Sequence, residues 1–399
     1  MNTNASHKKI GLVLSSAPGY SETFFRNKIR GLEANGYEVT LFVDQPPAKD
    51  QQLPCKTISN VDLQAGILKK TRSLFHIVFK SIFSHFGASL RLFRLERKDG
   101  RSIKEALKSV VLNEFLLNET LDWLHFGFGM LAHNRENVAE AIHAKMAVSF
   151  RGFDLYLSPL KHPGCYDRLF KKQVSYHVLS NEMKQTLIAH TIPSETITVI
   201  TPAIDVAFFS SEAQKTPNVI LQIVTVARLH WKKGIEYTLE PLSLLKKQHI
   251  AFHYKIIGVG EERERLVFAA HQLGIEDHVE FMGKLSPEQV KGCLNEADLY
   301  VQYSIQEGFC NAVVEAQSMG LLCIVSNAEG LSENVINSKT GWVVPKRQPA
   351  LLAQKIIEVH QMPYSEKEII KQNAVERAKH HFNLEAQHTA FDLFYKAQA

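Results

Sequence analysis

Short segments rich in Val, Ile and Leu alternate with longer amphipathic segments along the whole chain of 399 residues, and this alternation restricts the possible folds most strongly. It is typical of sheets in which helices join parallel strands, because neighbouring parallel strands need a long crossover connection. The sequence therefore predicts the α/β class with two sets of strands. In the first half they are expected at residues 8–16, 37–44, 121–128, 146–152, 175–181 and 196–203, and in the second half at 219–229, 252–260, 278–284, 298–304, 321–327 and 341–345.

The two sets of strands predict two doubly wound, Rossmann-like domains. We expect an N-terminal domain over residues 1–204, a polar, Pro-containing linker over 205–218 and a C-terminal domain over 219–375. Residues 376–399 have apolar side chains at helical spacing, which fits either an ordinary helix of the second domain or a helix that crosses back to the first. Ligands of such sheets bind beyond the carboxyl ends of the strands, so we expect a site in a cleft that both domains face.

Composition favours an ordinary globular protein, with 45% hydrophobic and 22% charged residues. Its five cysteines have neither metal-ligand spacing nor an even-numbered disulfide framework, so a reducing cytoplasm is expected. No apolar run approaches the roughly 20 residues that a membrane-spanning helix needs. The first apolar run is too short and too early for a secretion signal.

Positive charge is concentrated in residues 69–108, which hold eleven Lys or Arg against three acidic residues, whereas the rest of the chain has 35 basic and 38 acidic residues. Apolar residues recur there at helical spacing: Phe75, Val78, Phe79, Ile82, Phe86 and Phe93. This pattern fits either a helix buried in the first domain or a surface that binds anionic lipid at the inner face of a membrane. Nucleic acid is not expected as a partner, because the aromatic residues form a stripe rather than a stacking platform.

Candidate ligand-binding residues follow two strands of the second half. Arg228 and Lys233 follow one strand and precede a helix, where two cations can hold a phosphate or diphosphate, although a solvated basic turn is the alternative. Gly258 and Gly260 lie in the next turn, where missing side chains let backbone approach a ligand. Arg263 occupies the third glycine position of the dinucleotide fingerprint, so no nicotinamide cofactor is expected.

The stretch "EGFCNAVVE" begins and ends with a carboxylate residue. Glu307 is expected in the loop after a strand and Glu315 two turns into the following helix. Carboxylates accept hydrogen bonds from vicinal hydroxyls, so this spacing suits a polyol such as a sugar or a ribose. The backbone N–H groups at the helix start are expected to be exposed at its positive end. These belong to Gly308, Phe309, Cys310 and Asn311. The alternative, two solvated acids on a helix surface, fits Glu315 poorly because its neighbours in sequence are apolar.

In this combination the residues resemble the retaining nucleotide-sugar glycosyltransferases of family 4, which have the GT-B fold. The likeness is carried by Arg228 with Lys233-Gly234, Gly258-x-Gly260, "EFMGKLS", Glu307-x7-Glu315, "EGLSENV" and "TGWVV", and in the first half by "APGYSETFFRNKIRGLEANGYEV", "LHFGF" and "VSFRGFDL". It covers almost the whole chain. The "FRG" sequence resembles a polysaccharide-assembly branch that includes colanic-acid-type enzymes.

The resemblance implies a role for each matching residue. Arg228 and Lys233 would neutralise the diphosphate of a UDP- or GDP-linked sugar as it leaves. Glu307 would bind the donor sugar together with the backbone of residues 308–311, and Glu315 would bind the ribose. The region from Met282 to Lys284 would lie against the base.

The first domain would supply the acceptor side of the site. The resemblance assigns this role to Ser21, Glu22, His125, Arg151 and Asp154. Two of these residues also have structural interpretations. Ser21 can cap a helix, and His125 can satisfy a buried strand end.

The expected activity is retaining transfer of a sugar to a glycan or lipid-linked acceptor. No Asp or Glu is evident as a nucleophile, so the leaving diphosphate would accept the acceptor proton on the same face of the sugar. No metal clamp is evident, and Arg228 and Lys233 would take its place. Two alternatives are a nucleotide-sugar epimerase on the same fold and a non-catalytic glycosyltransferase-like subunit. A dehydrogenase is disfavoured by the missing fingerprint.

Overall fold

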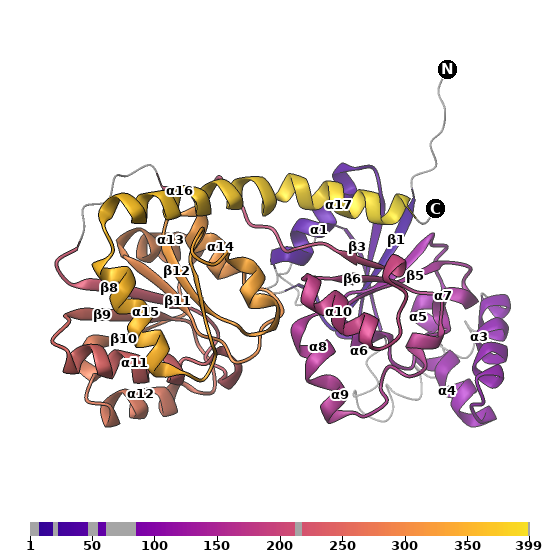
Figure 1. Ribbon diagram of the computed structural model, residues 1–399. Helices are drawn as coiled ribbons and strands as arrows, with labels where there is room; N and C mark the ends of the chain where they lie inside the picture. Colours follow the sequence, from indigo (N-terminus) through magenta and orange to yellow (C-terminus); the bar gives the residue numbers. More distant parts are fainter. Residues whose placement is uncertain (1–7, 19–22, 47–54, 61–84, 212–217, 398–399) are drawn as a thin grey trace, which may run out of the picture. The chain divides into compact units, whose positions relative to one another are not determined.

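The computed structural model describes residues 8–18, 23–46, 55–60, 85–211 and 218–397, and the chain forms two compact units (Figure 1). Unit 1 comprises Met1–Val178, Lys184–Ile200 and His388–Ala399, and unit 2 comprises Leu179–Met183 and Thr201–Gln387. Each unit is built around one parallel sheet with helices packed against it. The predicted α/β class with two Rossmann-like sheets is confirmed.

The sheet of unit 1 has the strand order β3-β2-β1-β4-β5-β6-β7, and all neighbouring strands are parallel. The strands are β1 (Lys9–Leu14), β2 (Glu38–Val43), β3 (Lys56–Ser59), β4 (Trp123–Phe126), β5 (Lys145–Ser149), β6 (Ser175–Val178) and β7 (Ile197–Val199). Sequence analysis predicted all of these except β3. That strand is short and none of its residues is fully buried, so it lacks the apolar run of the others.

Helices of the first half and the C-terminal helix accompany this sheet. They are α1 (Thr23–Ala34), α3 (Phe86–Lys98), α4 (Ile103–Leu112), α5 (Glu114–Leu117), α6 (Gly129–Ala132), α7 (Val138–Ala141), α8 (Gly152–Tyr156), α9 (Ser158–Lys161), α10 (Asn181–Ala189) and α17 (Leu384–Lys396). From His388 onward α17 belongs to unit 1. Its Phe391, Phe394 and Tyr395 share a hydrophobic core with side chains of β1 and β2.

The sheet of unit 2 has the strand order β10-β9-β8-β11-β12-β13, again entirely parallel. Its strands are β8 (Leu221–Val226), β9 (Phe252–Ile257), β10 (Val279–Gly283), β11 (Leu299–Gln302), β12 (Leu322–Ser326) and β13 (Trp342–Val344), all within predicted segments. Its helices are α11 (Glu236–Lys247), α12 (Arg263–Gln272), α13 (Pro287–Glu296), α14 (Asn311–Ser318), α15 (Pro349–Gln361) and α16 (Tyr364–His381).

The strand order of the unit 2 sheet has a topological switch point between β8 and β11. Strands β9 and β10 extend the sheet on one side of β8, and β11 to β13 extend it on the other. In doubly wound sheets ligands bind at such a switch point, beyond the carboxyl ends of the strands. The loops after β8 and β11 are therefore where the fold places a site.

The boundary between the units precedes the predicted linker. Residues 201–211 belong to unit 2, where Ile204 forms an isolated bridge with Asn383 and Phe209 accepts a hydrogen bond from Ser318. Ile204 and Phe209 are buried, so these residues pack against unit 2 although the stretch was predicted to be a polar linker. No helix in the described ranges is both long and apolar enough to cross a membrane.

Candidate functional site

The loops after β8 and β9 run side by side. Ala227 and Leu229 donate backbone hydrogen bonds to Ile257 and Val259, at 2.9 and 3.0 Å. Gly258 has a φ of +140°, and a Cβ there would lie 1.9 Å from the Ala227 carbonyl oxygen. Glycine is thus required by contact between the two loops, in addition to any contact with a ligand.

Lys233 and Glu307 form an ion pair at the switch point. Lys233 ends a short 3-10 helix, η4 (Trp231–Lys233), and its amino group contacts the carboxylate of Glu307 in the loop after β11. The two side chains are only 12% and 11% exposed. Burial alone would lower the pKa of Lys233, but the Glu307 carboxylate outweighs it and the net shift is upward. The amine is therefore charged at neutral pH and ready to bind an anion.

Two further cations lie near this pair. Arg228 is exposed, and its guanidinium has no ion pair with any described residue. Lys232, which sequence analysis did not single out, is only 8% exposed. Burial lowers its pKa, the nearby Glu307 opposes this, and Lys233 and Arg228 add to it. Three cations against one carboxylate form a site with a net positive charge, as a diphosphate requires.

The loop after β11 is held by the segment after β12. The backbone N–H of Glu307 donates to a carboxylate oxygen of Glu329 at 3.0 Å, and its carbonyl accepts from the N–H of Gly330 at 3.1 Å. Cys310 N–H donates to Asn334 Oδ1 at 3.2 Å, and Cys310 O accepts from Asn334 Nδ2 at 2.9 Å. The loop is therefore held in place by hydrogen bonds within unit 2.

The prediction of exposed N–H groups at the start of α14 is wrong for Cys310, because Asn334 already occupies its N–H. Gly308, Phe309 and Cys310 are all buried residues, and the Phe309 ring lies 5.5 Å from that of Phe382. Asn311, the first helical residue, is only partly buried. Packing by the neighbouring segment explains the difference, since sequence analysis considered only the helix itself.

Glu315 lies inside α14 among buried neighbours. Burial raises the pKa of its carboxyl to about 7. No described residue forms a hydrogen bond or an ion pair with this carboxyl group. A desolvated carboxyl with unused acceptor atoms is costly unless a ligand completes it, which fits a group that binds hydroxyls.

The end of β10 adjoins the glycine turn. Gly283 accepts a hydrogen bond from the N–H of Gly258 at 2.8 Å. Of the residues expected near a base, Met282 is partly buried and Lys284 is exposed. The structure thus brings the carboxyl ends of β8, β9, β10 and β11, with the predicted donor-side residues, to one edge of the sheet.

His125 does not face an acceptor, contrary to expectation. It is 0% exposed within β4, and its ring nitrogens contact Tyr395 Oη at 2.6 Å and Ser149 Oγ at 2.7 Å. Burial, with the adjacent Lys28, holds the pKa of His125 well below its usual value, so the ring is neutral. The structural alternative is correct, because no ring atom is left for a ligand.

Asp154 has a structural role as well, so its expected contact with an acceptor is wrong. It is 4% exposed, and its carboxylate accepts backbone hydrogen bonds from Gly129 and Arg151, both at 2.5 Å. Burial raises the pKa of Asp154 to about 7, against the effect of these bonds. The residue joins the loops after β4 and β5.

The other acceptor-side predictions stay open. Arg151 is partly exposed, and its guanidinium lies 3.5 Å from the centre of the Phe24 ring, a cation–π contact that fixes its direction. Ser21 and Glu22 lie outside the described residues. Of the acceptor-side residues in the described ranges, Arg151 is therefore the one that keeps its candidacy.

Residues 204–377 match the family model described as "Glycosyl transferases group 1". All of these matched residues belong to unit 2, and the matched region is referred to as the group 1 domain. Almost the whole chain is similar to two curated relatives. It is 28% identical over 392 residues to "Putative colanic acid biosynthesis glycosyltransferase WcaL" of Escherichia coli (strain K12), covering 94% of this chain and 96% of the relative. It is 27% identical over 362 residues to "Amylovoran biosynthesis glycosyltransferase AmsK" of Erwinia amylovora, covering 86% and 88%.

Solved structures of the same fold include a glycosyltransferase from Rickettsia africae ESF-5, with a TM-score of 0.71, 18% identity and 98% of each chain covered. Anabaena Alr3699/HepE in complex with UDP also has a TM-score of 0.71, at 15% identity, covering 98% of this chain and 100% of that one. The fold is therefore of the GT-B type. The GT-B fold predicted from the sequence is confirmed.

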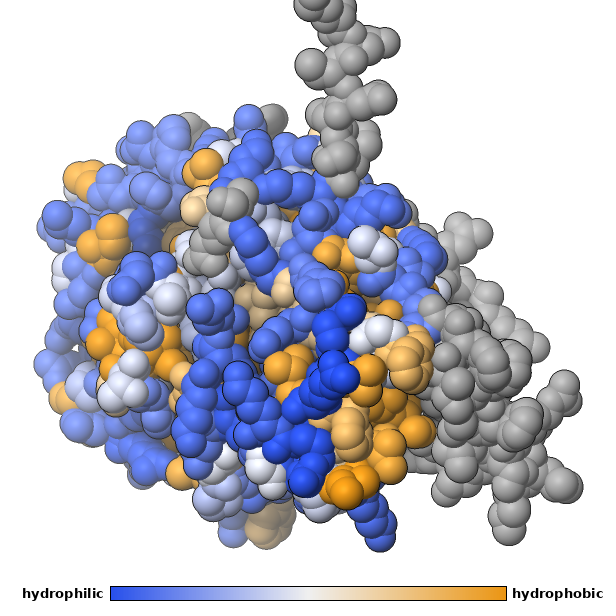
Figure 2. Space-filling model, turned by 90° about the vertical axis from the view of Figure 1, so that its right-hand side faces the viewer, coloured by the Kyte–Doolittle hydropathy of each residue, from blue (hydrophilic) through white to orange (hydrophobic). Residues whose placement is uncertain are grey.

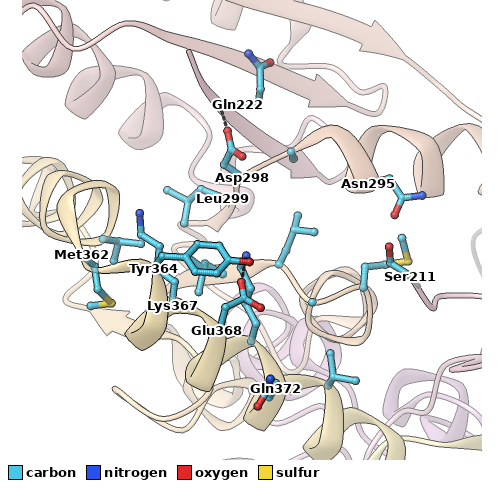
Figure 3. A pocket seen from close by; sticks show the side chains of 18 of the residues that line it. Ser211, Gln222, Asn295, Asp298, Leu299, Met362, Tyr364, Lys367, Glu368 and Gln372 are labelled. Atoms are coloured by element: carbon cyan, nitrogen blue, oxygen red, sulfur yellow. Dashed lines mark hydrogen bonds and ion pairs between the residues drawn. The ribbon is translucent and has the colours of Figure 1, made fainter. Parts of the chain in front are cut away.

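A large groove of about 1300 Å³ lies elsewhere in the group 1 domain (Figure 3). It is formed by the starts of β8, β11 and β12, including Leu221 and Leu299, and by α16 with Tyr364 and Lys367. Amino ends of strands and carboxyl ends lie at opposite edges of a parallel sheet, so this groove is separate from the candidate residues. Among the described residues, no group of three or more His, Cys, Asp or Glu side chains could hold a metal ion.

No role was predicted for Glu329 or Asn334 from the sequence, although both lie in the "EGLSENV" stretch. The available signal was strand adjacency, because β12 pairs with β11 and its following loop must lie beside that of β11. Polar residues in this segment of the group 1 domain were therefore candidates for contact with Glu307.

Proposed function

We propose that this chain is a retaining glycosyltransferase that moves a sugar from a UDP- or GDP-linked donor to a glycan or lipid-linked acceptor in polysaccharide assembly. The observation that carries the proposal is the Lys233–Glu307 ion pair at the switch point, beside the exposed Arg228. The names of WcaL and AmsK support a role in polysaccharide assembly. The UDP complex of HepE, a protein of the same fold, supports a nucleotide donor.

The ion pair suits a site whose two charged side chains are buried when no ligand is bound but interact with a charged ligand when it binds. Alone, Lys233 and Glu307 neutralise each other, which limits the cost of their burial. When a donor binds, its diphosphate takes the place of the carboxylate at Lys233, and Glu307 accepts hydrogen bonds from sugar hydroxyls. Glu315 accepts the two ribose hydroxyls, which completes its unused acceptor capacity.

Transfer then depends on electrostatic stabilisation. The bond between sugar C1 and the diphosphate oxygen breaks, and the acceptor oxygen bonds to C1 on the same face. The acceptor proton passes to the departing diphosphate oxygen, whose growing charge Arg228 and Lys233 stabilise without a metal ion. Loss of one such preorganised contact typically reduces kcat by about 10²-fold or more. Arg151 of unit 1 would contact the acceptor.

Ligand binding and one substitution test this function. A thermal-shift screen with UDP, GDP and their sugars should reveal the donor, since a ligand at about 100 times its Kd stabilises the fold by roughly 2.7 kcal/mol. Glu307→Ala should abolish transfer but spare nucleoside diphosphate binding. Full turnover by this variant would refute the role of Glu307.

Further outcomes separate the alternatives. Epimerisation of the donor in the absence of acceptor would identify an epimerase. Donor binding without turnover on any acceptor would identify a non-catalytic subunit. Product with inverted anomeric configuration would refute retention.

We propose in addition that the basic segment contacts an anionic membrane at the cytoplasmic face, where a lipid-linked acceptor would lie. In its described part, Phe86, Ile103 and Leu107 of α3 and α4 are 59%, 60% and 54% exposed. The same two helices carry exposed cations: Arg94, Arg97, Lys98, Lys104 and Lys108. Figure 2 shows hydrophobic residues beside hydrophilic ones on the face that carries these helices. Phe75, Val78, Phe79 and Ile82 lie outside the described residues.

Vesicle pelleting tests the membrane contact. Replacement of Arg94 and Lys104 by Glu should reduce binding to anionic vesicles, since each cation near the surface contributes about 1 kcal/mol. The matched control replaces Lys247 and Arg347, two exposed cations of unit 2, by Glu. Equal pelleting of both variants and the unaltered protein would count against the contact.

A further inference from the structure

The carboxylate of Glu329 links three parts of the site in unit 2. Glu329 begins a 3-10 helix, η6 (Glu329–Asn334), directly after β12. One of its carboxylate oxygens accepts the Glu307 N–H at 3.0 Å, and the other accepts Lys346 Nζ at 2.9 Å. Lys346 also donates to the Ile305 carbonyl at 3.1 Å. Glu329 and Lys346 therefore hold the loop after β11 at two backbone positions, one of them that of Glu307.

The backbone at Glu329 is strained. Its φ is +23°, in the region that residues with a side chain rarely adopt. Such a conformation persists only where surrounding contacts enforce it, and it concentrates at functional sites. The next residue, Gly330, shows how close the packing is, since a Cβ there would lie 2.0 Å from the Gly308 carbonyl oxygen. Glycine at position 329 would relieve the strain but would remove the carboxylate.

We propose that Glu329 and Lys346 are positioning residues that fix the backbone of Glu307 for donor sugar binding. The inference rests on the proposed function, because it assumes that Glu307 binds the sugar. Side-chain exposures of 22% for Glu329 and 34% for Lys346 leave this pair partly shielded from solvent. A charged acceptor strengthens the bond to the Glu307 N–H.

The physical consequence is a division of labour within the donor site. The diphosphate is held by Arg228 and Lys233, which form no hydrogen bond or ion pair with Glu329, so its affinity should not depend on this carboxylate. The sugar is held by Glu307, whose backbone does depend on it. A displacement of about 1 Å at a reacting group can cost roughly 10²-fold in rate. Loss of Glu329 should therefore lower turnover and leave nucleoside diphosphate binding intact.

Three substitutions test the proposal: Glu329→Gly, Glu329→Gln and Lys346→Met. We expect Glu329→Gly to bind UDP and GDP as the unaltered protein does and to lose about 10- to 100-fold in kcat. Glu329→Gln should recover part of the loss, because its amide oxygen still accepts the Glu307 N–H. The matched controls are Glu358→Gln and Lys355→Met, which break an ion pair of the same kind on α15 and should leave kcat unchanged.

Amide hydrogen exchange at Glu307 measures the hydrogen bond between the Glu307 N–H and the Glu329 carboxylate, and it requires no activity assay. Because a hydrogen bond to a charged group is lost, exchange of the Glu307 N–H should be roughly tenfold faster or more in Glu329→Gly, and unchanged in Glu358→Gln. Unchanged exchange, unchanged kcat, or a parallel loss of diphosphate binding and turnover would overturn the proposal. If the unaltered protein bound no nucleotide sugar, the proposed function would fail, whatever the exchange rate showed about the hydrogen bond from Glu307 to Glu329.

Discussion

Substitution of Glu315 by Gln should make the protein more stable at alkaline pH and a weaker binder of its nucleotide. Burial raises the pKa of this carboxyl from an ordinary value near 4.5 to about 7. The folded state then holds a proton that the unfolded state releases between these two pH values. Stability is greatest below about pH 4.5 and is lost as the pH rises through 7.

The size of this effect follows from the shift. A difference of about 2.5 pH units corresponds to about 3 kcal/mol at pH 8, at 1.36 kcal/mol for each unit. A glutamine has no charge to desolvate, so Glu315→Gln should avoid this loss. For a unit of this size the difference corresponds to roughly 6–12 °C in the melting temperature.

Thermal unfolding of both proteins from about pH 4 to pH 8, without ligand, measures the effect. The gap between the two melting curves should open as the pH rises and close below pH 5. Asp154, also titrating near 7, is present in both proteins, so its contribution cancels. Parallel curves, or a variant less stable than the unaltered protein at pH 8, would refute the reasoning. Binding of UDP or GDP at pH 8 should weaken about tenfold in the variant, as a charged acceptor of hydrogen bonds is lost.

Three other predictions concern single contacts. Lys233→Met should reduce transfer by about 10²-fold or more, and it leaves the Glu307 carboxylate without its ion-pair partner. The double variant with Glu307→Gln should therefore lose less than the sum of the two single losses, expressed as free energies. A double-mutant cycle in kcat/KM measures this. Gly258→Ala should destabilise unit 2 by at least about 2 kcal/mol, because its Cβ would overlap a backbone carbonyl; thermal unfolding measures this, and an unchanged melting temperature would contradict it. Tyr395→Phe removes the hydrogen bond to His125 and should lower the stability of unit 1 by about 1–3 kcal/mol, with kcat unchanged in a transfer assay; a large fall in kcat would restore His125 to the acceptor site.

The corrections in unit 1 share one physical origin. The resemblance to a glycosyltransferase family assigned His125 and Asp154 to the acceptor side, and both lie near the end of a strand. Strand position does not tell whether a polar side chain points into solvent or satisfies buried backbone. His125 is bonded to Tyr395, 270 positions away in the sequence, and that contact exists only after α17 packs on unit 1. Local pattern carries no information about such a partner.

Lys28 illustrates the same point for a charge. No role was predicted for this residue from the sequence. It is 2% exposed, and its amino group lies 3.3 Å from His125 Nδ1 and 4.2 Å from the centre of the Phe391 ring. Burial, with Arg151 nearby, holds the pKa of Lys28 well below its usual value. The burial that lowers this pKa arises only when the chain packs, so the local sequence does not reveal it.

The sequence by itself determined the α/β class and every described strand except β3, and it placed the proposed donor-side residues after β8, β9 and β11. Alternation of apolar runs with amphipathic segments is a local property, and in a parallel sheet the residues that follow each strand reach the same edge. Only the tertiary structure decided which polar groups near the strand ends of each sheet are already occupied: the Cys310 N–H by Asn334, the Glu307 N–H by Glu329, and the Asp154 carboxylate by backbone. These bonds join segments that are distant in the chain, and burial, which sets their strength, arises when the segments pack together.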